Sequence, residues 1–175
     1  MSSVQNDYFQ LFDLPAQFDI DKKLLETNYR KIQSTSHPDR FVSAIGAEKL
    51  ASMQLATHSN EAYATLKNAA RRARYLLEQH GIDAIADTNT ALPMDFLMQQ
   101  MEWREQLEDA KTARDIAALE SLHKTLRSEA QMLESELARL FDHENDYTAA
   151  TELTRKLIFI DKVCADIQQA IEYLD

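Results

Sequence analysis

The residues of this chain whose types and order could do chemistry are the run His37-Pro38-Asp39-Arg40. A histidine and an aspartate this close could form an acid–base pair, but no nucleophile or oxyanion-type donor stands near them in the sequence. The plainer interpretation is a turn that ends a helix, because proline fixes its own φ and disfavours a helical conformation in the residue before it. We therefore expect that the protein is not an enzyme. We expect this run to contact another protein.

The other residue types that bind metals or form covalent bonds are few and scattered. Cys164 is the only cysteine, and it falls on an apolar helical stripe, where a small buried side chain is commoner than a reactive thiol. Four further histidines have neither HxxxH spacing nor cysteine partners: His58, His80, His123 and His143. We expect no bound metal ion and no cofactor.

The composition predicts long helices joined by few connections. Of 175 residues, 45% are hydrophobic and 27% are charged, and only 2 Gly and 3 Pro are available for turns, fewer than a sheet protein needs. The sequence contains no run of about 18 apolar residues, the length needed to span a membrane. The first residues lack the basic start and apolar stretch of a leader peptide. We expect an all-α protein of the cytoplasm.

The net charge of −10 is distributed unevenly along the chain. Residues 1–80 contain 10 Lys and Arg against 9 Asp and Glu, whereas residues 81–175 contain 9 against 20. A phosphate backbone would repel the acidic second half. We therefore expect no nucleic-acid partner.

Apolar spacing predicts a helical hairpin in the N-terminal half, flanked by two short helices. A first short helix is expected from about Asp7 to Leu14, and Asp19 or Asp21 can cap the next helix, which must end before the His-Pro-Asp run. A longer helix begins near Ala47 and can return antiparallel to it, with the run at the tip. A fourth helix ends at Gly81, a natural C-terminal stop.

The second half predicts three helices with apolar stripes at spacings of three and four. They span about residues 93–110, 113–143 and 146–174. Such stripes also suit an intermolecular coiled coil, but the short breaks between them favour an intramolecular three-helix bundle. The predicted domains are residues 1–80, a linker at 81–92, and residues 93–175.

The first helix of this bundle carries more apolar residues than one buried stripe can use. Phe96, Trp103, Leu107 and Ala110 form its core line, so the remaining apolar residues face another side: Leu97, Met98 and Met101. Phe159 lies off the core line of the third helix, where we expect it to be exposed. A polar rim stands nearby: Glu102, Arg104 and Glu105. These residues could dock another protein, or pack against the linker or the N-terminal domain.

Several motifs reinforce these expectations. Around the His-Pro-Asp run stand three segments that together resemble the J-domain of the DnaJ class: Asp7-Tyr8-Phe9-Gln10-Leu11-Phe12, Tyr29-Arg30-Lys31-Ile32 and Asn60-Glu61-Ala62-Tyr63-Ala64-Thr65-Leu66. Two segments of the second half resemble the C-terminal domain of the HscB family, J-type co-chaperones of iron–sulfur cluster assembly: Phe96-Leu97-Met98-x-Gln100-x-Glu102-x-Arg104-Glu105 and Arg155-Lys156-Leu157-x-Phe159-x-Asp161-Lys162.

The HscB resemblance implies two partners and two sets of contact residues. The first is the DnaK-type chaperone HscA, whose ATP hydrolysis the family stimulates, contacted through His37, Pro38, Asp39, Arg40, Lys23, Arg30 and Lys31. The second is the iron–sulfur scaffold IscU, delivered to HscA and contacted through Leu97, Met98, Met101, Glu102, Arg104, Glu105 and Phe159. Cluster transfer and maturation of iron–sulfur proteins would follow.

Two rival interpretations of the same residues stay open. The chain could be a J-domain adaptor for a different client protein. It could also be a structural helical adaptor in which His37-Pro38-Asp39 is only a turn, and then replacing His37 would not affect the ATP hydrolysis of any chaperone.

Overall fold

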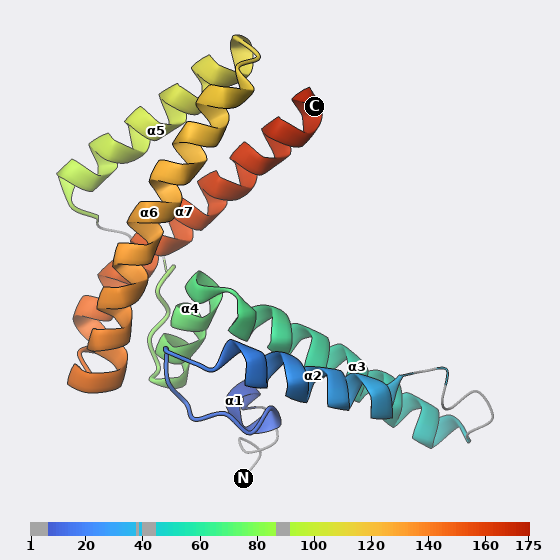
Figure 1. Cartoon of the computed structure of the whole chain (residues 1–175). Helices are drawn as coiled ribbons and strands as arrows, with labels where there is room; N and C mark the ends of the chain where they lie inside the picture. Colours follow the sequence, from blue (N-terminus) through green and yellow to red (C-terminus); the bar gives the residue numbers. More distant parts are fainter. Residues whose placement is uncertain (1–6, 38, 40–44, 87–91) are drawn as a thin grey trace. The chain divides into compact units, whose positions relative to one another are not determined.

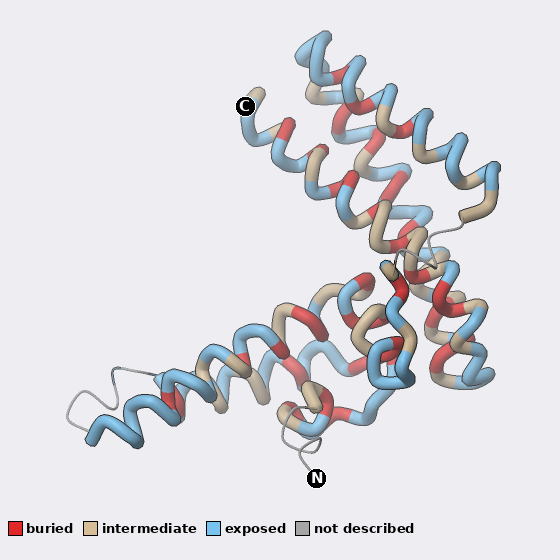
Figure 2. The backbone as a smooth tube through the Cα atoms, turned by 180° about the vertical axis from the view of Figure 1, so that it is seen from behind, coloured by how far each residue is buried: buried red, intermediate tan, exposed pale blue. Residues whose placement is uncertain are grey.

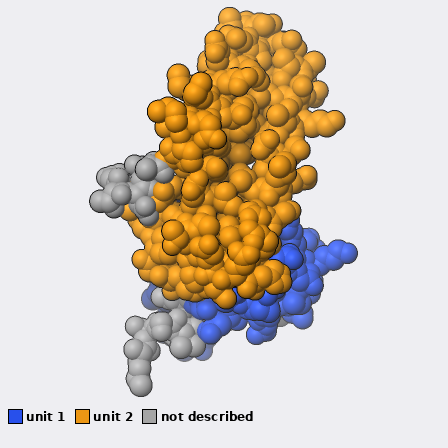
Figure 3. Space-filling model, turned by 90° about the vertical axis from the view of Figure 1, so that its left-hand side faces the viewer, with its two compact units in different colours: residues 1–76 blue, residues 77–175 orange. Residues whose placement is uncertain are grey.

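The computed structural model describes residues 7–37, 39, 45–86 and 92–175. Over these residues the chain is helical and contains no strand (Figure 1), which confirms the predicted all-α class. None of the helices in these ranges has the length and apolar content needed to cross a membrane. The chain divides into two compact units, residues 1–76 and 77–175 (Figure 3). Pro38 and Arg40, both predicted contact residues, lie outside the described residues.

The first unit is the predicted helical hairpin with short flanking helices. Its helices are α1 (Tyr8–Leu11), α2 (Lys22–Ser36), α3 (Gly46–Lys67) and α4 (Ala69–Gln79), the last of which continues past the end of the unit. Helix α1 is shorter than predicted, because the backbone N–H groups of Phe12 and Leu14 both donate to the carbonyl of Phe9 and close a turn there. The cap of α2 is Asp21, whose carboxylate accepts the N–H groups of Lys23 and Leu24, each at 3.0 Å.

Helices α2 and α3 lie side by side and form the hairpin (Figure 1). Tyr29 of α2 stacks on Tyr63 of α3 with ring centroids 4.0 Å apart. The Tyr29 hydroxyl also donates to Oδ1 of Asn60 at 2.6 Å. Stacked aromatic rings stabilise a helix pair beyond the area they bury, so these residues set the distance between the two helices in the middle of the hairpin.

A buried arginine joins the ends of three segments in this unit. Arg72 of α4 donates to the carbonyl oxygens of Phe18 and Leu66, both at 2.7 Å, and its guanidinium lies 4.6 Å from the centre of the Phe18 ring. A buried charge is tolerated when its donors are satisfied in this way. Arg72 therefore fixes α4 to the loop before α2 and to the end of α3.

The second unit contains the predicted three-helix bundle, built from α5 (Met94–Thr112), α6 (Ile116–Arg139) and α7 (Tyr147–Leu174). The three helices pack side by side, and their buried residues face one another (Figure 2). Helix α6 continues into a short π-helix, η3 (Leu140–Glu144). Both turns of the bundle contain a residue with positive φ, Arg114 at 54° and Asn145 at 53°. These tight reversals make the bundle intramolecular, as the short breaks predicted.

The bundle core contains the predicted apolar stripes. Trp103, Leu107 and Ala110 of α5 are buried, and Cys164 is buried among the stripe residues of α7, as predicted. The other large fully buried side chains are Leu119, Leu126, Leu137, Ile160, Val163 and Ile167. Phe96 is the exception to the predicted core line, because it is only half-buried.

Part of the predicted linker packs against the bundle. Ala84 is buried, and its carbonyl oxygen accepts a 2.7 Å hydrogen bond from Nε of Arg155 on α7. The ring of His80 stacks on Tyr147 with centroids 3.9 Å apart. These contacts place residues 77–86 in the second unit. The boundary between the two units falls after Leu76. The domain limits 1–80, 81–92 and 93–175 stay a prediction.

Candidate protein-binding surfaces

The first candidate surface is the end of α2, where His37 and Asp39 are both exposed. The backbone N–H of Asp39 donates to Nδ1 of His37 at 3.2 Å, and a carboxylate oxygen of Asp39 lies 3.4 Å from the same nitrogen. The Asp39 side chain is 87% exposed, so its carboxylate is open to a partner's donor.

The residue before His37 is held firmly. Ser36 is buried, its hydroxyl donates to the carbonyl of Ile32 at 2.7 Å, and its own carbonyl accepts a 2.6 Å hydrogen bond from the hydroxyl of Ser52 on α3. His37 therefore leaves α2 from a point that is fixed to the neighbouring helix. Ser52 was not among the predicted residues, although a serine on the inner face of a helix is a recognisable signal for such a contact.

The predicted basic residues of α2 are exposed along the helix. Lys23 and Arg30 are seven positions apart and so share one face. Arg30 forms an exposed ion pair with Glu26 at 2.6 Å, which contributes little to stability because both groups are solvated. Lys31 lies beside Arg30 and is exposed as well. Together they give α2 a basic surface that extends toward His37.

The second candidate surface is the exposed apolar side of α5. Leu97, Met98 and Met101 are exposed, Met98 and Met101 by 65% and 73%. Met94 was not among the predicted contact residues but is also exposed, one turn before Met98. Unbranched, polarisable Met side chains adapt to irregular partners. These four residues, which we call the α5 patch, form an apolar surface of the kind that docks other proteins.

Phe159 is half-buried, so the prediction that it is exposed was wrong in degree. The reason is Phe96 of α5, whose ring packs edge-on against Phe159 with centroids 6.1 Å apart and an interplanar angle of 82°. The guanidinium carbon of Arg104 lies 5.5 Å from the centre of the Phe159 ring. Arg104 also donates to a carboxylate oxygen of Asp166 at 2.8 Å. Phe159 and Arg104 therefore meet across the two helices.

The three predicted rim residues lie on different sides of helix α5. Residues two apart on a helix are separated by about 200° around its axis, so Glu102 and Arg104 point to opposite flanks of α5. Arg104 lines a groove of about 410 Å³ between α5 and α7, while Glu102 accepts a 3.4 Å hydrogen bond from Gln106. Glu105 is exposed. Arg104 is the rim residue whose guanidinium lies over the Phe159 ring.

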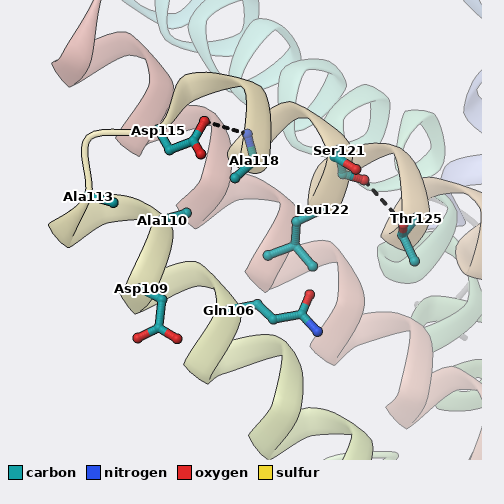
Figure 4. A pocket seen from close by; sticks show the side chains of 9 residues that line it. All are labelled: Gln106, Asp109, Ala110, Ala113, Asp115, Ala118, Ser121, Leu122 and Thr125. Carbon is teal, nitrogen blue, oxygen red and sulfur yellow. Dashed lines mark hydrogen bonds between the residues drawn. The ribbon is translucent and has the colours of Figure 1, made fainter.

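A second hollow of about 450 Å³ lies where α5 turns into α6 (Figure 4). Two of its polar side chains form hydrogen bonds within α6 and its cap. The Asp115 carboxylate accepts the N–H of Ala118 at 3.0 Å, and the Thr125 hydroxyl donates to the Ser121 carbonyl at 3.1 Å. None of the predicted contact residues lines this hollow. We therefore assign it no role in the two candidate surfaces.

Comparison with known proteins gives one consistent answer. Residues 92–168 match a family model described as the HSCB C-terminal oligomerisation domain. A co-chaperone protein HscB homolog from Paraburkholderia phymatum is 47% identical over 175 residues, which is 100% of this chain and 99% of the relative.

Solved structures agree in fold over nearly the whole length. The chaperone HscB from Vibrio cholerae is 35% identical with a TM-score of 0.80, covering 97% of this chain and 99% of its own. The human co-chaperone protein HscB is 27% identical with a TM-score of 0.84, covering 95% of this chain and 83% of its own. The chain therefore belongs to the HscB family of co-chaperone proteins.

Proposed function

We propose that this protein is a co-chaperone that binds an IscU-type scaffold for iron–sulfur clusters and delivers it to a DnaK-type chaperone, HscA. It stimulates ATP hydrolysis by that chaperone and so promotes cluster transfer. Membership of the HscB family supports the co-chaperone role. The observation that carries the proposal is the presence, on separate units of one chain, of an exposed His37–Asp39 pair and the apolar α5 patch.

On the chaperone side, the end of α2 makes the contact. The Asp39 carboxylate accepts charge-assisted hydrogen bonds from an arginine of the chaperone, and the basic residues Lys23, Arg30 and Lys31 steer the encounter with acidic surface. Stimulation requires that the hydrolysis-competent arrangement is bound more tightly than the resting one. A tenfold acceleration needs only about 1.4 kcal/mol of such preference, which a few desolvated contacts supply.

On the scaffold side, the α5 patch and the Phe159–Arg104 contact bind the client. Apolar side chains supply most of the affinity, while Arg104 supplies directional hydrogen bonds to the partner. Carrying both partners on one chain raises the local concentration of the client at the chaperone. The protein is thus proposed to act as an adaptor in the bacterial cytoplasm, with no cofactor and no enzymatic step of its own, the iron and sulfide remaining on the scaffold.

The test is steady-state ATP hydrolysis by the HscA chaperone of the same cell, with this protein and the IscU scaffold added singly and together. We expect stimulation that grows when both are present and is lost in His37→Gln. A matched control is His143→Gln, since His143 is an exposed histidine of the second unit, and this variant should stimulate like wild type.

Other outcomes distinguish the rival functions. Stimulation that needs His37 but is unaffected by the scaffold would favour a J-domain adaptor for a different client. Absence of stimulation, or stimulation equal in wild type and His37→Gln, would refute the chaperone contact and leave a structural helical adaptor.

A further inference from the structure

We propose that Asp166 is a positioning residue of the scaffold-binding surface: it holds the Arg104 guanidinium across Phe159 in the orientation that the partner meets. This inference rests on the proposed function. Asp166 belongs to none of the sequence motifs that pointed to the surface, and only the packing of α7 on α5 brings it there.

The geometry joins three side chains from two helices. Phe159 and Asp166 are seven residues apart on α7 and so share one face. Arg104 of α5 lies across both, with Nη1 2.8 Å from Oδ2 of Asp166 and Cζ 5.5 Å from the centre of the Phe159 ring. The cation is thus restrained at two points, by the carboxylate and by the ring face.

The ion pair remains accessible to a partner. The side chains of Arg104 and Asp166 are 39% and 38% exposed, and both line the groove between α5 and α7. A guanidinium has five N–H donors in a fixed fork, and the contact with Asp166 engages one terminal nitrogen. The rest of the fork can reach a carbonyl or carboxylate oxygen of the scaffold while an apolar scaffold side chain covers Phe159.

Asp166 benefits binding because it orders the Arg104 side chain before the scaffold binds. A long arginine side chain has many rotamers, and their loss on binding opposes association. A half-exposed ion pair adds little to the stability of the fold itself. Asp166 instead restricts Arg104 before the partner arrives, so less entropy is lost when the complex forms. The effect of Asp166 should therefore appear in scaffold affinity and depend on the presence of Arg104.

The experiment is a double-mutant cycle on the full chain, with purified IscU scaffold titrated by calorimetry. We expect Asp166→Asn to raise Kd about fivefold. In the Arg104→Ala background the same change should alter Kd by less than about 1.5-fold, because its target is gone. Asp166→Glu preserves the carboxylate and should bind within about twofold of wild type.

A matched control separates charge from geometry. Glu129 is exposed on α6 and does not line this groove, so Glu129→Gln removes the same charge without touching Arg104 and should leave Kd unchanged. If Asp166→Asn binds like wild type, or weakens binding equally with and without Arg104, Asp166 does not position Arg104. If wild type itself fails to bind the scaffold, the proposed function is refuted at its scaffold half and this inference with it.

Discussion

The hydroxyl of Ser52 on α3 donates a 2.6 Å hydrogen bond to the backbone carbonyl of Ser36, the last residue of α2, and both residues are buried. The last carbonyls of a helix have no partner within the helix, and this one is satisfied from the neighbouring helix. Because His37 follows immediately, the same bond fixes the point from which His37, a proposed chaperone contact, leaves α2.

Replacing Ser52 by alanine should therefore destabilise the hairpin. The buried Ser36 carbonyl would lose the donor that Ser52 supplies, which costs about 1–3 kcal/mol. Urea unfolding followed by circular dichroism measures this. Thr57→Ala is the control on the same helix, because the exposed Thr57 hydroxyl donates only within α3, to the Met53 carbonyl, and should change stability by less than about 0.5 kcal/mol. Equal stabilities of the two variants would contradict a structural role for the Ser52 bond.

Two adjacent arginines of α4 should respond very differently to the same substitution. Arg72→Met removes the Arg72 donors to the carbonyls of Phe18 and Leu66 in the core, and we expect a loss of about 3 kcal/mol in the free energy of unfolding. Arg71 is exposed and pairs with Glu61 at 3.2 Å, so Arg71→Met should cost less than about 1 kcal/mol. Thermal unfolding of both variants provides the comparison, and a loss in Arg71→Met as large as that in Arg72→Met would be inconsistent with this assignment.

Truncating Phe159 should weaken scaffold binding. Removal of a central aromatic anchor commonly costs 2 kcal/mol or more, so we expect Phe159→Ala to raise Kd about thirtyfold. Met132→Ala removes an exposed apolar side chain from α6, outside the proposed surface, and should bind within about twofold of wild type. Undiminished binding by a correctly folded Phe159→Ala protein would show that the scaffold docks elsewhere.

Cys164 should make stability fall at alkaline pH. Burial raises the pKa of its thiol, an effect that Arg127 opposes and Asp161 adds to. The unfolded chain, with an ordinary thiol, then loses its proton at lower pH than the folded chain, so the folded state loses relative stability as pH rises above about 8.5. Below that pH the contribution is fully present.

The measurement compares wild type with Cys164→Ala. The decrease in the free energy of unfolding between about pH 8 and pH 10 should be steeper in wild type, since the variant lacks this titrating group. Parallel pH profiles would mean that the thiol titrates alike in the folded and unfolded chain. Iodoacetamide should also modify the folded protein far more slowly than the urea-unfolded protein, because only the exposed thiolate reacts.

Much of the architecture was accessible from local rules. Regular spacing of Leu119, Leu122 and Leu126, with short breaks between the stripes, is enough to predict a folded bundle, because each helix must bury its apolar face. Gly81, with φ of 74°, is likewise a helix stop chosen locally. The sequence offered Asp19 or Asp21 as the cap of α2, and the structure has Asp21. The exposed Met98 and Met101 followed from there being more apolar residues on α5 than one core stripe accommodates.

The contacts that give the two surfaces their geometry join residues far apart in the chain, and no local pattern specifies such pairs. Ser36 meets Ser52 only once α2 and α3 have packed together. Phe159 proved half-buried because α7 places it against Phe96, and the same packing sets Asp166 against Arg104. Helix periodicity tells which face of each helix turns inward, but the rotation and axial shift of one helix against another depend on the summed packing of all their side chains.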